Sequence, residues 1–303
     1  MLRETREILT KGGFAVGEIM GKSAIFDIAA KRDRIFLILK VLVNVDSLRN
    51  EMARELKILG NELCATPLII GKKSGLGEIL DGVVYTRHGI PAISVGTLRD
   101  FVLENVYPEV YVAPGGFYVN IDGSKLRNLR ERYGLSLGHL ANIAGVSRKA
   151  IQFYEEGMSS TVDVALKLEE YLGEELIVPI DLLNFGDLRE DRISNPEVFL
   201  GDIYHRLVSM GYDVLITIKG PFDAISKDER EVFLTGVEES ERKIKSKSLN
   251  MRVVSQIFGK RGFIVVNEFR YMNYNGIAII RKKELMRYSK DELKEVVEER
   301  CEI

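Results

Sequence analysis

The chain has 303 residues, of which 46% are hydrophobic and 29% charged, and its formal net charge is −2. This length and balance allow more than one buried core, and the near-neutral charge excludes a protein that coats nucleic acid non-specifically. The longest apolar run, IFLILKVLV, is interrupted by Lys40 and is too short to span a bilayer, and no signal peptide is expected because a charged helix follows Met1. Cys64 and Cys301 are too few for a disulfide framework or a zinc knuckle, so we expect free thiols in the cytoplasm.

The first hundred residues alternate between helical and strand patterns. A charged amphipathic helix follows Met1, and a strand follows Gly13-Phe14. The segment FDIAAKRDRIFLILKVLVNVDSLRNEMARELKILG, which begins at Phe26, then gives a charged turn, a strand-forming run and a long amphipathic helix. The buried strand CATPLIIG, a second strand GVVYTRHG and a helix opened by Thr97 follow. We therefore predict an N-terminal α/β domain over residues 1–108.

The next segment, YPEVYVAPGGFYVNIDG, contains two short β-rich runs. They flank Ala113-Pro114-Gly115-Gly116, whose Pro and Gly residues are typical of a turn. The pattern predicts a hairpin linker over residues 109–123.

The segment from Gly134 to Gly157 predicts two short helices packed near a right angle. Leu140, Ala141 and Ala144 share one helical face, and Ala141 is small enough for a close helix contact. Gly145 tolerates the positive φ of a sharp turn, and Gly157 ends the second helix. Helix N-caps are predicted directly before each helical pattern, at Ser136 and Ser147.

The longer pattern LRNLRERYGLSLGHLANIAGVSRKAIQFYEEG resembles the helix-turn-helix of the phage repressor and Cro class in register. The resemblance implies a five-helix DNA-binding domain over residues 124–180, with the second helix of the motif in the major groove. It places on the exposed side of that helix Ser147, Arg148, Lys149, Gln152 and Phe153. The alternative is an ordinary pair of helices with no role in nucleic-acid binding.

Basic residues concentrate between Lys125 and Lys149, whereas acids return from Glu155 onward. We expect Lys125 and Arg130 to contact phosphates, together with Ser136 at the start of a helix. Leu137 stands where many relatives carry a Gln that grips the DNA backbone, so the phosphate clamp at this position is in question. The alternative is a solvated, charged face.

The region after the helix-turn-helix repeats the element order of the first domain. An irregular connector is predicted over residues 181–196, and a second α/β domain over residues 197–303. The segment FDAISKDEREVFLTGVEESERKIKSKSLNMRVVSQIFG is followed by the strands FIVVNEF and GIAIIRKK, which we match to CATPLIIG and GVVYTRHG, and by a helix opened by Ser289. The recurrence predicts an internal duplication. The alternative is two unrelated α/β domains.

The repeated order is similar to the core of restriction-endonuclease-like nucleases. In that family an Asp and a Glu-x-Lys gather a metal ion, since Mg²⁺ prefers hard oxygen ligands. Asp27 and Lys40 match, but Ile38 replaces the second carboxylate. In the other copy Asp223 matches, whereas the carboxylate and Lys positions hold Leu234 and Gly236. We expect neither metal site to be complete, although Glu18 or Glu51 is left open as a substitute.

The whole arrangement resembles a family of archaeal helix-turn-helix transcriptional regulators. It implies a cytoplasmic regulator that binds double-stranded DNA sequence-specifically as a homodimer. We predict no enzymatic activity, no catalytic residue, no metal, no cofactor and no membrane contact, and the sequence names no small-molecule effector. The main alternative is a metal-dependent nuclease or DNA-repair factor that the helix-turn-helix targets to DNA. A weaker alternative is a module that binds RNA or a partner protein.

Overall fold

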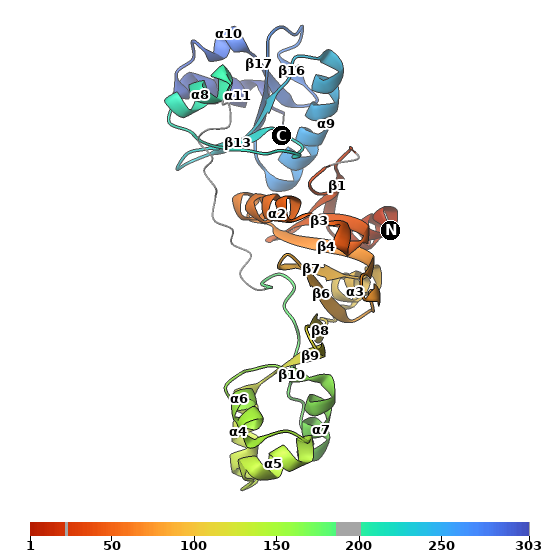
Figure 1. Cartoon of the computed structure of the whole chain (residues 1–303). Helices are drawn as coiled ribbons and strands as arrows, with labels where there is room; N and C mark the ends of the chain where they lie inside the picture. Colours follow the sequence, from red (N-terminus) through yellow and green to blue (C-terminus); the bar gives the residue numbers. More distant parts are fainter. Residues whose placement is uncertain (22–23, 186–200, 303) are drawn as a thin grey trace.

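The computed structural model describes residues 1–21, 24–185 and 201–302. Three parts follow one another in space in Figure 1: the C-terminal unit (residues 201–302), the N-terminal unit (residues 1–108) and the helix-turn-helix unit (residues 109–180). Of the predicted connector over residues 181–196, only residues 181–185 lie within the described part of the chain. None of the described helices is long and apolar enough to cross a membrane.

The N-terminal unit is a mixed sheet with helices on both faces. Its elements are α1 (Leu2–Lys11), β1 (Ala15–Glu18), β2 (Ile28–Arg32), β3 (Ile35–Asn44), η1 (Val45–Ser47), α2 (Asn50–Leu63), β4 (Thr66–Ser74), β5 (Gly77–Glu78), β6 (Val83–Arg87), β7 (Ile90–Ile93), α3 (Val95–Arg99) and η2 (Asp100–Glu104). The strand order is β1-β2-β3-β4-β7-β6, and β3, β4 and β7 run parallel.

The apolar run of β3 explains this layering. Successive side chains of a strand point to opposite faces of the sheet, so a continuous apolar run suits a strand that is covered on both sides. Ile38 packs in the core under α2, whereas Leu37 and Leu39 pack in the core under α1 and α3. The interrupted apolar stretch thus forms a central strand that is covered on both faces of the sheet.

The C-terminal unit repeats the strand order of the N-terminal unit. Its elements are α8 (Asp202–Ser209), β12 (Asp213–Ile216), β13 (Ala224–Lys227), β14 (Val232–Val237), α9 (Glu241–Phe258), β15 (Gly262–Val266), β16 (Asn273–Tyr274), β17 (Ile277–Arg281), α10 (Lys282–Leu285) and α11 (Lys290–Arg300). The order β12-β13-β14-β15-β17-β16 is that of β1-β2-β3-β4-β7-β6, and β14, β15 and β17 again run parallel.

The predicted match between GVVYTRHG and GIAIIRKK was wrong. The first of these segments is β6, but β17 occupies the position of β7, which pairs parallel with the preceding strand β4. β7 and β17 both follow a tight turn with two left-handed residues, His88-Gly89 (φ 50° and 79°) and Asn275-Gly276 (φ 55° and 78°). A strand that enters such a turn is antiparallel to the strand that leaves it, so β6 cannot take the place beside β4.

The sequence predicted the first residue correctly for one of the two helices that follow the last strands of the α/β units, α11, but not for the other, α3. α3 begins before Thr97, because the hydroxyl of Ser94 accepts the hydrogen bond from the Thr97 N–H at 2.9 Å. Thr97 therefore lies inside the helix and is not its cap. Ser289 caps α11 as predicted and forms a capping box with Glu292.

The N-terminal and C-terminal units pack against each other through equivalent residues. Glu55 in α2 and Asn250 in α9 each stand nine residues before the left-handed residue that ends their helix. The carboxylate of Glu55 accepts the Ile218 N–H (2.7 Å), and the amide of Asn250 accepts the Met20 N–H (2.8 Å) and donates to the Met20 carbonyl (2.8 Å). Met20 and Ile218 each lie two residues beyond the first strand of their unit. The interface thus has the self-complementary form of a two-fold pair within one chain.

The helix-turn-helix unit begins with an antiparallel strand pair, in the segment where the sequence predicted a hairpin linker. Its elements are β8 (Val110–Ala113), β9 (Gly116–Ile121), α4 (Gly123–Arg132), α5 (Leu137–Ala144), α6 (Arg148–Glu155), β10 (Ser160–Thr161), α7 (Val162–Leu172) and β11 (Ile177–Val178). β8 pairs with β6 and with β9, and β9 pairs in turn with β10 and β11. One run of paired strands therefore continues from the N-terminal unit into this unit.

The predicted five-helix count was wrong. Residues 124–180, all of which the structure describes, contain four α-helices. Gly173 adopts φ 68° and ends α7, after which the chain turns back and Ile177 pairs with Ile121 of β9. A fifth helix is excluded here because these residues are used as a strand.

Candidate nucleic-acid interface

The turn between α5 and α6 has the geometry that the sequence predicted. The Ser136 hydroxyl accepts the His139 N–H, and the Ser147 hydroxyl accepts the Ala150 N–H, each at 3.1 Å. Gly145 adopts φ 71° between the two helices. Both N-caps and the glycine turn are thus confirmed, and they fix where each helix starts.

A small core holds the helices of this unit in place. Leu126 from α4, Leu140 and Ala141 from α5 and Ile151 from α6 are buried in one cluster, which also includes Leu168 of α7. Ala141 is 3% exposed, as expected for a small residue at the contact between crossing helices. Since Ile151 faces inward, the residues on the other side of α6 face outward.

The outward side of α6 carries the predicted DNA-reading residues. Ser147, Arg148, Lys149 and Gln152 are exposed, and Phe153 is half-buried. The Lys149 ammonium lies 5.3 Å from the centre of the Phe153 ring, and the Gln152 amide donates to the Glu156 carboxylate at 3.2 Å. These contacts join neighbours one turn apart and leave donors on the surface.

Arg130 is occupied by a partner that the sequence reasoning missed. Its Nε and Nη2 donate to the two oxygens of Glu155 at 2.5 and 3.0 Å, and Nη1 donates to the Leu135 carbonyl at 3.4 Å. Glu155 is 8% exposed, and the hydrogen bond to it raises the pKa of Arg130 further. The pair gives Arg130 a structural role that a phosphate would have to compete with. A signal existed, since Glu155 follows Ile151 by four residues on the buried face of α6.

The other two predicted phosphate contacts lie at the starts of helices. Lys125, in the first turn of α4, has its ammonium 3.1 Å from the Glu174 carboxylate and is half-buried. Ser136 is exposed at the start of α5, where its hydroxyl serves as the cap. The structure thus brings the α6 residues together on one face, and places Lys125 and Ser136 on other helices.

In the N-terminal unit, the nuclease-like Asp27 forms an ion pair with Lys40 of the neighbouring strand β3. Asp27 accepts the Val41 N–H at 2.7 Å, and the Lys40 ammonium lies 3.1 Å from its other oxygen and donates to the Ala24 carbonyl at 2.6 Å. Ile38 is fully buried, so an apolar side chain fills the position of the second carboxylate. Of the possible substitutes, Glu18 pairs with Arg6 at 3.0 Å, and Glu51 is exposed in the first turn of α2.

In the C-terminal unit, the equivalent Asp meets a lysine from a helix. Asp223 accepts the Val237 N–H and the Lys247 ammonium, each at 2.6 Å, and Lys247 also lies 3.1 Å from Glu238. Sequence reasoning missed this contact between Lys247 and Asp223. The available signal was Gly236, which removes the lysine from the strand position. Within the described ranges, no three His, Cys, Asp or Glu side chains gather as metal ligands would.

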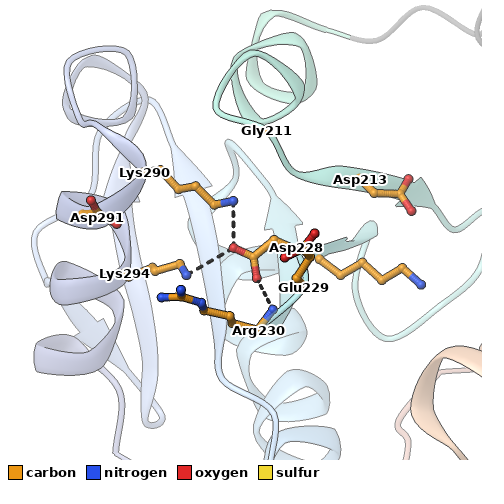
Figure 2. A pocket seen from close by; sticks show the side chains of 9 residues that line it. Gly211, Asp213, Asp228, Glu229, Arg230, Lys290, Asp291 and Lys294 are labelled. Carbon is orange, nitrogen blue, oxygen red and sulfur yellow. Dashed lines mark hydrogen bonds and ion pairs between the residues drawn. The ribbon is translucent and has the colours of Figure 1, made fainter.

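A broad hollow of about 600 Å³ on the C-terminal unit is lined by residues of α11, by the start of β12 and by the turn between β13 and β14 (Figure 2). Asp228 accepts hydrogen bonds from Lys290 (2.7 Å), from Lys294 (3.2 Å) and from the N–H groups of Arg230 and Glu231. Burial alone would raise the pKa of Asp228, but these hydrogen bonds outweigh it and hold the pKa well below its usual range. The ion cluster therefore ties α11 to the turn between β13 and β14, and its groups are already paired with one another.

Comparison with known proteins agrees with two of these parts. Residues 1–108 match the PD-(D/E)XK superfamily domain, and residues 126–177 match the helix-turn-helix family. No solved structure matches the chain.

Relatives match over the full length of the chain. A protein of Archaeoglobus fulgidus is 36% identical over 100% of this chain and 98% of its own length. A protein of Natronomonas pharaonis is 39% identical (97% and 96%), and one of Methanocaldococcus jannaschii is 37% identical (98% and 95%). Each carries a provisional name as an HTH-type transcriptional regulatory protein. The chain therefore belongs to this archaeal family, in which a PD-(D/E)XK-type domain precedes a helix-turn-helix.

Proposed function

We propose that the chain is a transcriptional regulator that binds double-stranded DNA sequence-specifically through α6. The observation that carries this proposal is the exposed side of α6, where cationic, amide and aromatic side chains stand on a helix that begins at the Ser147 cap, directly after the Gly145 turn. The names of the full-length relatives point the same way.

The side chains on α6 suit different parts of DNA. Gln152 can pair with adenine once it releases Glu156, and Lys149 can donate to guanine O6 or N7. Phe153 presents an apolar ring that fits the methyl group of thymine. We propose that the phosphates of the DNA backbone are contacted by Ser147, Ser136 and Lys125. Arg130 is instead assigned to the ion pair with Glu155.

The proposed assembly on DNA is a homodimer. Two helix-turn-helix units would then address half-sites about one helical turn apart. The N-terminal and C-terminal units already pair with each other inside one chain, through Glu55 and Asn250. A second copy would therefore bind through a different surface.

We infer that the C-terminal unit is a second copy of the PD-(D/E)XK-type fold, and that the domain boundaries follow the sequence prediction. The shared strand order and the equivalent Asp27 and Asp223 support this inference. We further propose that neither copy is an enzyme. A lysine ammonium neutralises each Asp, and the buried Ile38 and Leu234 supply no metal ligand.

The test of DNA recognition is selection of the purified chain against random duplex DNA at about 150 mM salt, where non-specific phosphate binding is weak. We expect an enriched, two-fold symmetric motif. Gln152→Ala should cost about 1–3 kcal/mol at one base pair of that motif. Lys167→Ala is the matched control, because Lys167 lies on α7 and pairs with Asp163 at 2.7 Å. Failure of the wild type to enrich any motif would contradict the proposal.

The rival function is a metal-dependent nuclease, and it has its own test. Plasmid DNA is incubated with the full chain and Mg²⁺ or Mn²⁺. We expect no cleavage, because each Asp carboxylate is held by an ammonium group. Cleavage that disappears in Asp27→Ala would overturn the non-enzymatic assignment.

A further inference from the structure

The side chain of Arg148 lies across the first turn of α5. A Cβ atom at position 138 would stand 2.7 Å from Nε of Arg148 and 3.1 Å from its Cζ and Nη2. These separations are shorter than van der Waals contact, so a side chain at position 138 would require the flexible guanidinium to shift, whereas glycine allows the position that it adopts. Arg148 therefore points back from α6 toward the start of α5.

This guanidinium keeps its donors available, in contrast to Arg127 and Arg130. Both of those side chains bind the carboxylate of Glu155. Arg148 is exposed and makes no hydrogen bond or ion pair with any residue that the structure describes. Five N–H donors in a rigid fork thus face solvent beside α5, an arrangement that suits a bidentate phosphate contact.

The first residues of α5 offer no side-chain hydrogen-bond donor to a DNA phosphate. Leu137 is the first residue of the helix, and its side chain packs against the core of the unit. The hydroxyl of Ser136 is used as the cap for the His139 N–H. The N–H groups of Leu137 and Gly138, in the first turn, have no partner within the helix.

We propose that Arg148 grips a phosphate of the DNA backbone beside the start of α5, and that Gly138 is the residue that positions it there. This inference rests on the proposed DNA binding and assigns one contact within it. Arg148 then fixes the orientation of the duplex, because phosphate contacts carry no sequence information. Base reading falls to Lys149, Gln152 and Phe153.

The experiment measures Kd for the selected motif and for its single-base-pair variants over a range of salt concentrations. For Arg148→Ala we expect about a tenfold weaker Kd, equal across all variants, and a slope of log K against log salt that is shallower by about 0.9. Gly138→Ala should displace the guanidinium and reproduce the loss. The double variant should bind no more weakly than Arg148→Ala alone.

Gln152→Ala is the matched comparison, since its loss should fall on one base pair and leave the salt slope unchanged. Thermal unfolding of Gly138→Ala checks that the helix is intact, which is expected because Ala favours helices over Gly. A loss confined to one base pair in Arg148→Ala would overturn the phosphate assignment, as would unchanged affinity in Gly138→Ala. Either result leaves wild-type selection intact, whereas failure of the wild type to select any motif overturns the proposed function itself.

Discussion

The N-terminal and C-terminal units keep one aspartate contact and change its cationic partner. In both units the Asp after the loop that follows the first strand accepts a backbone N–H from the third strand, Val41 in one and Val237 in the other. The ammonium comes from the neighbouring strand residue Lys40 in the first unit and from Lys247 on helix α9 in the second.

The shared part of this contact shows what the aspartates do. The hydrogen bond to the third strand pins the loop before Asp27, and likewise before Asp223, to the centre of its sheet. A lysine neutralises the carboxylate in each unit. The position of this lysine in the chain differs between the units, but its ammonium group lies beside the carboxylate in both. The two aspartates therefore act as structural anchors, and the units should respond to their loss according to burial.

The largest difference is expected when the aspartates are removed. Asp27→Ala leaves Lys40 buried without its counter-ion and should lower the free energy of unfolding by about 3 kcal/mol. Asp223→Ala should cost about 1 kcal/mol, because Asp223 is 32% exposed and Lys247 keeps Glu238 as a partner. Urea denaturation of both variants measures the two losses. Equal losses would break the comparison between the units.

A smaller effect is expected from moving the lysine back to the strand. A Cβ at Gly236 would stand 3.1 Å from Sδ of Met251 and 3.2 Å from Cδ of Lys247, so Gly236→Lys alone should cost about 2 kcal/mol through overpacking. Adding Lys247→Met removes the competing ammonium and should restore about half of the loss. A double-mutant cycle on the free energy of unfolding measures this coupling. Strict additivity would show that the two positions are not interchangeable.

The smallest effect concerns the interface, where Glu55 and Asn250 make equivalent contacts. Burial raises the pKa of Glu55, against the opposing effect of the hydrogen bonds from the Ile218 and Lys219 N–H groups. A carboxyl group with a raised folded-state pKa stabilises the fold fully below its unfolded pKa and loses that contribution as pH rises through the folded value. Glu55→Gln keeps an acceptor, so it should flatten this decline and raise stability at pH 7 by less than about 1 kcal/mol.

Asn250→Asp is the matched change on the other side of the interface. The carboxylate would face the Met20 carbonyl, to which the Asn250 amide now donates, so stability should fall at pH 7 and recover on acidification. Unfolding curves from about pH 4 to pH 8 measure both variants. Parallel pH profiles for Glu55→Gln and the wild type would contradict the assignment of the titration to Glu55.

The sequence was most informative where the structure depends on neighbours along the chain. Ser136, Gly145 and Ser147 act within three or four residues of themselves, so their spacing predicted the caps and the turn before the structure was known. The aspartates of the two α/β units were also matched correctly, because each follows Phe in a repeated phrase.

Contacts between segments that are distant in the sequence could not be predicted from local patterns. Lys247 reaches Asp223 from α9, and Glu155 binds Arg130 from a different helix, so no local pattern pairs them. The counterpart of β17 was misassigned because local likeness does not show which strand lies beside β4. The position of Arg148 depends on the crossing of α5 and α6, which the sequence does not give at the level of one side chain.

Two segments of the chain, rather than a single one, connect the helix-turn-helix unit to the N-terminal unit. β8 is hydrogen-bonded to β6, and the returning chain is fastened by the Ile180 N–H, which donates to the Pro108 carbonyl at 2.7 Å. Twisting the unit about this stiff arm would break backbone hydrogen bonds. When α6 is bound to a duplex, the two α/β units would therefore lie on one fixed side of the DNA axis. Moving the binding site by half a helical turn, about five base pairs, would swing them to its opposite side.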